Sequence, residues 1–212
     1  MLITAGPTHE TIDPIRFIGN HSTGKMGYAI AGVFANSGAR VTLVSGPVNI
    51  QAENPAVRII RVTTAQEMFE ACSEHIEQAD IAVFSAAVAD FMPVKAEAEK
   101  IKSGKDELKI SLKPTPDIAR EMGRLKRPGQ LFVGFALETS DGMESARKKL
   151  VSKNLDLIVL NSLMDEGAGF GVDTNKVTFI DREGNIEKSD LKSKTEVAKD
   201  IYLRIEKLMN DA

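Results

Sequence analysis

Short apolar runs alternate along the chain with longer segments in which apolar residues recur at helical spacing. The apolar runs predict strands at residues 2–4, 40–45, 57–62, 81–85, 131–135 and 157–160. The segments between them predict helices at residues 25–36, 65–77, 116–124 and 142–153, and each separates two strands by the length that a parallel crossover requires. This rhythm predicts an α/β fold: a three-layer, Rossmann-like, mostly parallel sheet.

The pattern changes after residue 161. Residues 176–181 and 186–189 flank the turn-forming sequence Arg-Glu-Gly-Asn and predict a β-hairpin, which precedes a last helix at residues 193–209. A chain of 212 residues can bury one substantial core. We therefore expect residues 1–212 to form a single domain with a C-terminal hairpin and helix.

Two connections are too long for routine turns, at residues 5–23 and 91–109. The second alternates Lys with Glu and Asp around Gly104, so we expect a mobile loop around residues 91–109. Both connections leave the carboxyl ends of predicted strands, where open α/β sheets bind their ligands. They are expected to face one site.

The composition narrows the possible function classes. Hydrophobic residues make up 42% of the chain and charged residues 27%, and the net charge is −3, which excludes a nucleic-acid partner held by a basic surface. No apolar stretch approaches the roughly 20 residues that span a bilayer, and the N-terminus lacks the features of a signal peptide. The one cysteine, Cys72, cannot form an internal disulfide; we expect a buried structural thiol and a cytoplasmic location.

The densest cluster of candidate residues is segment 18–27, which leads into a predicted helix. Backbone N–H groups in the first turn of that helix are suited to a phosphate or carboxylate. Gly24-Lys25 superficially matches a nucleoside-triphosphatase loop, but Met26 stands where that loop needs a hydroxyl for magnesium. The alternative is a glycine-rich helix start that Ser22 or Thr23 caps.

Two further segments follow strands and have two interpretations each. The small residues from Ser85 to Asp90 allow a flat ring to approach the backbone, with Asp90 as a carboxylate, or they allow tight sheet packing. Lys100 and Lys102 form a lid over a triphosphate or belong to a solvated surface loop.

Three positions nearer the C-terminus are similarly ambiguous. Asp117 caps a helix or accepts ribose hydroxyls, and Phe135 packs on a base or completes the core. Lys149 and Lys153 lie four residues apart on one helix, where two ammonium groups repel unless an anion or acid lies between them; the alternative is an exposed face.

The sequence gives no sign of a redox cofactor or a zinc site. Gly6-Pro7 after the first strand does not make a dinucleotide fingerprint, and the three histidines have no metal-ligand spacing. A magnesium ion delivered with a nucleotide is more plausible, because it needs only a carboxylate or two and phosphate oxygens.

These features occur in an order that resembles one family. Residues 3–27 resemble the opening signature of the phosphopantothenoylcysteine synthetases, and later segments match the family's successive motifs over essentially the whole chain: 85–90, 100–102, 116–118, 134–136 and 149–156. The family's lysine motif usually continues with two adjacent lysines, whereas here Ser103 follows Lys102.

The resemblance implies a bacterial-type, CTP-dependent ligase of coenzyme A biosynthesis. Such an enzyme joins 4′-phosphopantothenate to L-cysteine through an acyl-cytidylate, with Mg²⁺, and releases pyrophosphate and CMP. Asn20 and Lys100 are implied as catalytic residues and Asp90 as a metal ligand. The implied nucleotide site is Ser85, Ala86, Ala87, Asp90, Lys100, Pro116, Asp117, Ile118, Ala119, Phe135, Lys149 and Lys153; the expected substrate and phosphate site is Gly6, Asn20, Ser22, Thr23, Gly24 and Lys25.

The resemblance also implies partners. The family forms homodimers, for which the 176–189 hairpin is a candidate contact, and in many bacteria it is fused to a flavin-dependent decarboxylase, which is a possible separate partner here. Two other functions stay open: a non-catalytic nucleotide-binding module, and an NAD(P)-type enzyme on a similar sheet.

Overall fold

The computed structural model describes the whole chain apart from residues 103–106, 139–141, 163–166, 168, 170 and 211–212. Its centre is an eight-stranded sheet with the strand order β13-β12-β10-β9-β6-β1-β4-β5. The strands are β1 (Leu2–Ala5), β4 (Val41–Ser45), β5 (Val57–Arg61), β6 (Ile81–Phe84), β9 (Leu131–Glu138), β10 (Leu157–Ser162), β12 (Val177–Asp181) and β13 (Ile186–Lys188). The six predicted apolar runs and the C-terminal hairpin are all strands of this sheet.

The order of the strands creates a switch point. The chain starts at β1 in the middle, moves outward through β4 and β5, and returns to the other side of β1 with β6, β9 and β10. These six strands are parallel, whereas β12 runs antiparallel to both of its neighbours, β10 and β13. The chain therefore reverses direction across the sheet between β1 and β6, the kind of place where open α/β sheets bind ligands.

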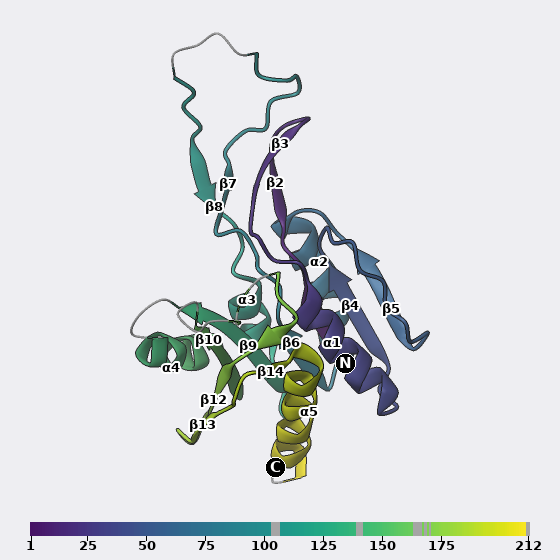
Figure 1. The fold of residues 1–212 in the computed structure, drawn as a ribbon. Helices are drawn as coiled ribbons and strands as arrows, with labels where there is room; N and C mark the ends of the chain where they lie inside the picture. Colours follow the sequence, from purple (N-terminus) through teal and green to yellow (C-terminus); the bar gives the residue numbers. More distant parts are fainter. Residues whose placement is uncertain (103–106, 139–141, 163–166, 168, 170, 211–212) are drawn as a thin grey trace.

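Helices cover both faces of the sheet (Figure 1). On one face, α1 (Lys25–Asn36) and α5 (Lys194–Asn210) pack on side chains such as Ile3 and Val83. On the other, α2 (Ala65–His75), α3 (Ile118–Leu125) and α4 (Gly142–Ser152) pack on side chains such as Leu2 and Ala82. Neighbouring strand residues face opposite layers, so buried parallel strands are apolar throughout. The three-layer Rossmann-like prediction is confirmed.

Several element boundaries differ from the sequence prediction. The predicted helix 116–124 begins only at Ile118, because the Asp117 side chain accepts a hydrogen bond from Arg120 N at 3.2 Å and caps it. The predicted helix 65–77 continues after His75 as the 3₁₀ helix η1 (Ile76–Gln78). Strand β9 extends to Glu138, beyond its predicted end at residue 135.

The two long connections form an arm that projects from the sheet (Figure 1). Sequence analysis did not predict its four short strands. Strands β2 (His9–Asp13) and β3 (Arg16–Gly19) form one ribbon, and β7 (Phe91–Pro93) and β8 (Leu112–Pro114) form the other. The expected mobility of loop 91–109 falls partly on residues 103–106, which lie outside the described residues.

One buried carboxylate ties the β2–β3 ribbon to the segment between β7 and β8. Asp13 is 1% exposed, and its Oδ2 accepts hydrogen bonds from Ile101 N at 3.1 Å and from the Arg16 guanidinium at 2.5 Å. Arg16 also donates to the Ile101 carbonyl at 3.2 Å. Burial by itself would raise the pKa of the Asp13 carboxyl, but the hydrogen bonds from Ile15 N, Ile101 N and Arg16 together lower it.

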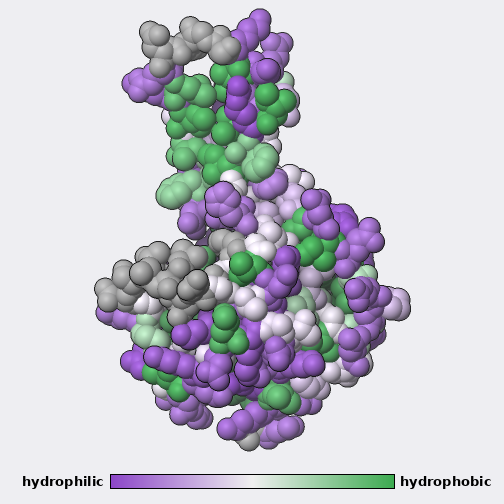
Figure 2. Space-filling model, in the orientation of Figure 1, coloured by the Kyte–Doolittle hydropathy of each residue, from purple (hydrophilic) through white to green (hydrophobic). Residues whose placement is uncertain are grey.

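The surface of the arm is unusually apolar. Figure 2 shows hydrophobic residues gathered along it, in contrast to the mostly polar face of the body below. Its exposed apolar side chains are Ile15, Phe17, Phe91, Val94, Leu108, Ile110 and Leu112. In the part of the chain that the structure describes, no helix is both long enough and apolar enough to cross a membrane.

Candidate functional site

A cavity of about 460 Å³ opens at the carboxyl ends of β1, β6, β9 and β10, next to the switch point. Its volume is in the range of small-molecule sites. The residues that sequence analysis singled out and that line this cavity are Asn20, Ser22, Thr23, Gly24, Lys25, Ser85, Ala86, Ala87, Asp90, Pro116, Asp117, Ile118, Ala119, Phe135, Lys149 and Lys153. The structure therefore brings together segments that are more than a hundred residues apart.

The start of α1 forms one wall of the cavity. The helix N-cap is Gly24, in a left-handed conformation with φ 77°, and no side chain caps it. Ser22 Oγ only accepts from Gly24 N at 3.4 Å, so the alternative in which Ser22 or Thr23 caps the helix is wrong. A side chain on Gly24 would be strained at this φ and would also meet Val48 at 2.9 Å. The first turn thus presents backbone N–H groups to the cavity.

Asn20 links the arm to the floor of the cavity. Its Nδ2 donates to the Ala87 carbonyl at 2.8 Å, which uses one of the two amide N–H groups. Ala86 N donates to Thr4 Oγ1 at 3.1 Å and Ala87 N to the Gly6 carbonyl at 2.9 Å. These two backbone N–H groups are satisfied within the protein, so a base recognised at Ser85–Ala87 would have to use the other backbone groups there.

The α3–α4 side of the cavity carries an ion pair. Lys153, which directly follows α4, donates from Nζ to Asp117 Oδ1 at 2.8 Å, so Asp117 both caps α3 and binds the lysine. Of the two lysines spaced four residues apart, Lys153 thus has an acid beside it. Phe135 is half-buried within β9 and packs against the core while it lines the cavity.

The α1–α5 side carries a second charged group. Lys25 Nζ donates to Asp173 Oδ1 at 2.6 Å and to the Gly171 carbonyl at 3.1 Å. Hydrogen bonding and the charge of Lys25 lower the pKa of the Asp173 carboxyl. Lys194 and Asn175 line the cavity beside this pair, and Asn175 Nδ2 donates to Asn161 Oδ1 at 3.3 Å.

Sequence reasoning missed Asp173, Asn175 and Lys194. They follow residue 161, where the alternation of strands and helices stops, and they come from a glycine-rich segment and a helix start. The only local signal was the presence of Asp and Asn beside glycines. Their position near Lys25 depends on α5 packing against α1, which no spacing in the sequence reveals.

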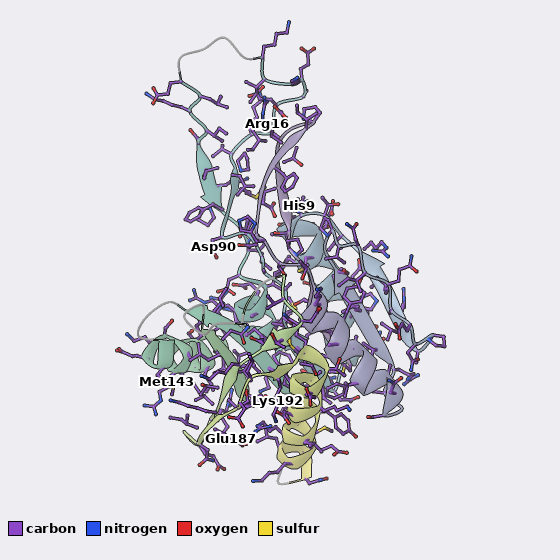
Figure 3. All side chains as sticks on the ribbon, in the orientation of Figure 1. His9, Arg16, Asp90, Met143, Glu187 and Lys192 are labelled. Carbon is purple, nitrogen blue, oxygen red and sulfur yellow. The ribbon has the colours of Figure 1, made fainter. Side chains whose placement is uncertain are left out.

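Two predicted residues do not line the cavity. Gly6 lies directly behind its wall, where its carbonyl accepts from Ala87 N. Lys100 is exposed on the arm, next to Ile101, whose backbone is held by Asp13 and Arg16. Figure 3 places Arg16 far out on the arm and Asp90 near its base. In this structure the arm therefore keeps Lys100 apart from the other predicted nucleotide-binding residues.

Asp90 is the best candidate ligand for a cation delivered with a nucleotide. It lines the cavity, and its carboxylate makes no hydrogen bond or ion pair with any described residue. The described residues contain no group of three or more His, Cys, Asp or Glu side chains that could hold a metal ion by themselves. A single carboxylate can contribute to a Mg²⁺ site only together with other oxygen ligands, such as phosphate oxygens.

Known proteins are similar to this chain in sequence and fold. Residues 1–209 match the family described as "DNA/pantothenate metabolism flavoprotein C-terminal domain". A relative named cysteine/cysteine sulfinic acid decarboxylase, from an unknown prokaryotic organism, is 53% identical over 97% of this chain and 57% of its own length. The coenzyme A biosynthesis bifunctional protein CoaBC of Bacillus subtilis is 45% identical over 97% of this chain and 50% of its own length. The chain thus spans about half the length of these curated relatives.

Solved structures agree with this match. The crystal structure of the C-terminal domain of a coenzyme A biosynthesis bifunctional protein CoaBC has a TM-score of 0.84 and 41% identity, and it covers 100% of this chain and 95% of that one. A DNA/pantothenate metabolism flavoprotein from Streptococcus pneumoniae has a TM-score of 0.85 and 25% identity, with 98% of each chain covered. Sequence, fold and the grouping of the predicted residues at one cavity agree: the chain belongs to the DNA/pantothenate metabolism flavoprotein C-terminal domain family.

Proposed function

We propose that this chain is a ligase that joins 4′-phosphopantothenate to L-cysteine at the expense of CTP, in coenzyme A biosynthesis. The observation that carries the proposal is the shared cavity at the switch point, which has lysines on both sides and Asn20 in its lining. Lysines on two sides suit reactants that bear phosphate groups. Relatives named as coenzyme A biosynthesis proteins support the choice of reaction.

In the first step, a carboxylate oxygen of phosphopantothenate attacks the α-phosphorus of CTP. The bond from that phosphorus to the bridging oxygen breaks, and pyrophosphate leaves with the bonding electrons. The acyl-cytidylate that remains is an activated carbonyl. Lys153, Lys149 and the Lys25 end of the cavity offset the negative charge that accumulates on the phosphates.

In the second step, the cysteine amine attacks the carbonyl carbon of the acyl-cytidylate, loses a proton, and CMP leaves. Asn20 is suited to this step because its amide donates hydrogen bonds without exchanging protons. One N–H already binds the Ala87 carbonyl at 2.8 Å, and this contact fixes the plane of the amide. The second N–H is then directed to the oxyanion that develops on the carbonyl.

Magnesium is proposed as the accompanying ion. When bound with CTP, Mg²⁺ would neutralise part of the phosphate charge. Asp90 would hold it from the protein side, since its carboxylate lines the cavity and no described residue occupies it.

A homodimer is proposed as the working form, with the arm as its interface. The exposed apolar side chains of the arm favour its association with the same surface of a second copy. The alternative contact, the hairpin 176–189, is less suited, because all three residues of its edge strand β13 are exposed and two of them are charged. A flavin-dependent decarboxylase remains a possible partner, in keeping with relatives about twice as long as this chain.

The test is a turnover assay with protein, CTP, Mg²⁺, 4′-phosphopantothenate and cysteine, in which pyrophosphate and CMP are measured. Both products are expected only when all substrates are present, and ATP in place of CTP is expected to support less turnover. Binding of CTP without either product would instead favour a non-catalytic nucleotide-binding module. A parallel reaction with cysteine alone, monitored for carbon dioxide, examines the activity named for the 53% identical relative.

A further inference from the structure

Lys194, the first residue of α5, lies outside the predicted site residues. It is 8% exposed and lines the cavity. Its ammonium donates to three backbone carbonyls, those of Gly169 at 3.1 Å, of Thr174 at 3.2 Å and of Val172. An ammonium has three N–H groups, so all of its donors are used by the segment that precedes β11 (Thr174–Asn175).

The same segment positions Lys25. Lys194 N also donates to the Asp173 carbonyl at 2.8 Å, which fixes the backbone on which the Asp173 side chain is carried. That side chain accepts from Lys25 Nζ at 2.6 Å, and the Gly171 carbonyl accepts from the same ammonium at 3.1 Å. Lys194 therefore determines where Lys25 points at the start of α1.

The charges in this group do not cancel. Lys25 and Asp173 form an ion pair, whereas Lys194 makes no ion pair with a carboxylate of any described residue. Desolvation and the nearby charge of Lys25 lower the pKa of the Lys194 ammonium, and Asp173 opposes this effect. Burial of an ammonium among neutral carbonyls is costly unless an anion compensates it. One positive charge thus remains in the cavity wall for a ligand to balance.

This group occupies the α1–α5 side of the sheet, whereas Lys149, Lys153 and Asp117 occupy the α3–α4 side. We propose that Lys194 is a positioning residue that holds segment 171–174 and Lys25 in place and, with them, forms a phosphoanion subsite at the α1–α5 end of the cavity. Its ligand is a phosphate or pyrophosphate group of a substrate or product. Which substrate supplies that group rests on the proposed ligase function, but the binding itself does not.

The group also contains a competitor for the ligand. Asp173 is 87% exposed at its side chain and holds the Lys25 ammonium when no anion is bound. A phosphate oxygen that binds Lys25 must displace this carboxylate or bind beside it against its negative charge. Removal of the Asp173 charge is therefore expected to favour the anion, while removal of the Lys194 charge disfavours it.

The experiment measures inorganic pyrophosphate binding to the whole chain by calorimetry at several salt concentrations. For Lys194→Met we expect affinity to fall about tenfold and to depend less steeply on salt, because one positive charge no longer takes part. The matched control is Lys192→Met, since Lys192 pairs with Asp200 at 2.7 Å and does not line the cavity; its affinity should stay within about twofold of wild type. Figure 3 places Lys192 beside α5.

A purely structural role would leave the salt dependence of Lys194→Met unchanged, and that result would overturn the proposal. Asp173→Asn decides the question if Lys194→Met does not fold, since an exposed side chain tolerates the change. We expect Asp173→Asn to bind pyrophosphate severalfold more tightly; unchanged or weaker binding contradicts the subsite.

Competition with 4′-phosphopantothenate and with CTP identifies which of the two supplies the phosphoanion. Turnover by the wild-type protein is measured separately. If the wild-type protein turns over its substrates and Lys194→Met binds pyrophosphate as the wild type does, this subsite alone is refuted. If the wild-type protein binds pyrophosphate but does not turn over its substrates, the ligase function alone is refuted.

Discussion

Lys153 Nζ lies 2.8 Å from Asp117 Oδ1, so the residue that directly follows α4 is tied to the residue that caps α3. Lys153→Met removes both a cation from the cavity and this tie. We expect the KM for CTP to rise about tenfold with a smaller change in kcat, because the lost contact acts on the bound nucleotide before the reaction as well as during it. Steady-state kinetics with CTP as the varied substrate measures both.

The matched control is Lys148→Met, within α4. Lys148 pairs with Glu144 at 2.7 Å on the exposed face and should leave the KM for CTP within about twofold. Equal effects of the two substitutions would mean that Lys153 has no special role at the cavity.

Asn20→Ala is expected to separate the two chemical steps. Pyrophosphate release should survive better than amide formation, because the Asn20 amide is proposed to stabilise the oxyanion of the second step. Pyrophosphate and phosphopantothenoylcysteine are measured in the same reaction, and Asn36→Ala, at an exposed contact with Asn54, is the control. A parallel loss of both products would contradict the second-step role.

Asp13 predicts how the arm responds to acid. The folded protein lowers the pKa of this carboxyl below its ordinary value of 3.8, so its contribution to stability is fully present above that value and is lost as the pH falls through the lowered pKa. Proteolytic cleavage of the arm should therefore increase at acidic pH below about 4. Asp13→Asn should cleave readily at neutral pH and show little further change in the acid range; a variant as resistant as wild type would refute the role of Asp13.

The buried pair of Lys126 and Asp156 predicts a large effect on stability. Lys126 Nζ donates to both Asp156 oxygens at 2.6 and 2.5 Å, its side chain is only 8% exposed, and Asp156 Oδ2 also accepts from Phe132 N. Lys126→Met leaves this carboxylate with Arg182 Nε, at 3.4 Å, as its remaining cation, and should lower the free energy of unfolding by roughly 2 kcal/mol in urea titrations.

The exposed pair of Arg124 with Glu121 is the control for Lys126. Arg124→Met should cost below about 1 kcal/mol, because solvent screens the pair. A loss of similar size in both variants would show that burial does not strengthen the Lys126 contact.

The arm predicts the oligomeric state. Phe17 and Phe91 are exposed on different ribbons, at 53% and 51% of their full area. If the arms of two copies meet, Phe17→Asp together with Phe91→Asp should convert a dimer to a monomer in light scattering, since a charge in an apolar interface is costly. Ile186→Asp on β13 is the control and should leave the dimer intact; the opposite outcome would move the interface to the hairpin.

Much of the central fold was accessible from sequence because buried parallel strands leave continuous apolar runs, as at residues 131–135 and 157–160. The arm was not, because its strands are only three to five residues long, with Pro14 in the turn after β2 and Pro93 at the end of β7. Strand order was also inaccessible, since hydrophobic spacing says which residues are buried but not which strands are neighbours.

The candidate site shows the same division. Asn20 and Asp90 follow predicted strands, so their meeting at one edge of the sheet could be anticipated. The alternative of a Ser22 or Thr23 cap on α1 was wrong, because Gly24 takes a left-handed conformation that the hydroxyls of Ser22 and Thr23 do not reveal. Lys194 belongs to the site only because α5 folds back beside α1, a contact between distant parts of the chain.

Residues at the base of the arm also line the cavity. Asn20 follows β3, Asp90 precedes β7 and Thr115 follows β8, and all three residues are part of the cavity lining. If the arm packs against a second copy of the chain, that contact also fixes the position of these three residues at the cavity. Assembly and ligand binding then become thermodynamically linked, and the linkage must act equally in both directions. Dilution would weaken the apparent affinity for CTP, and saturating CTP would strengthen the association of the two copies.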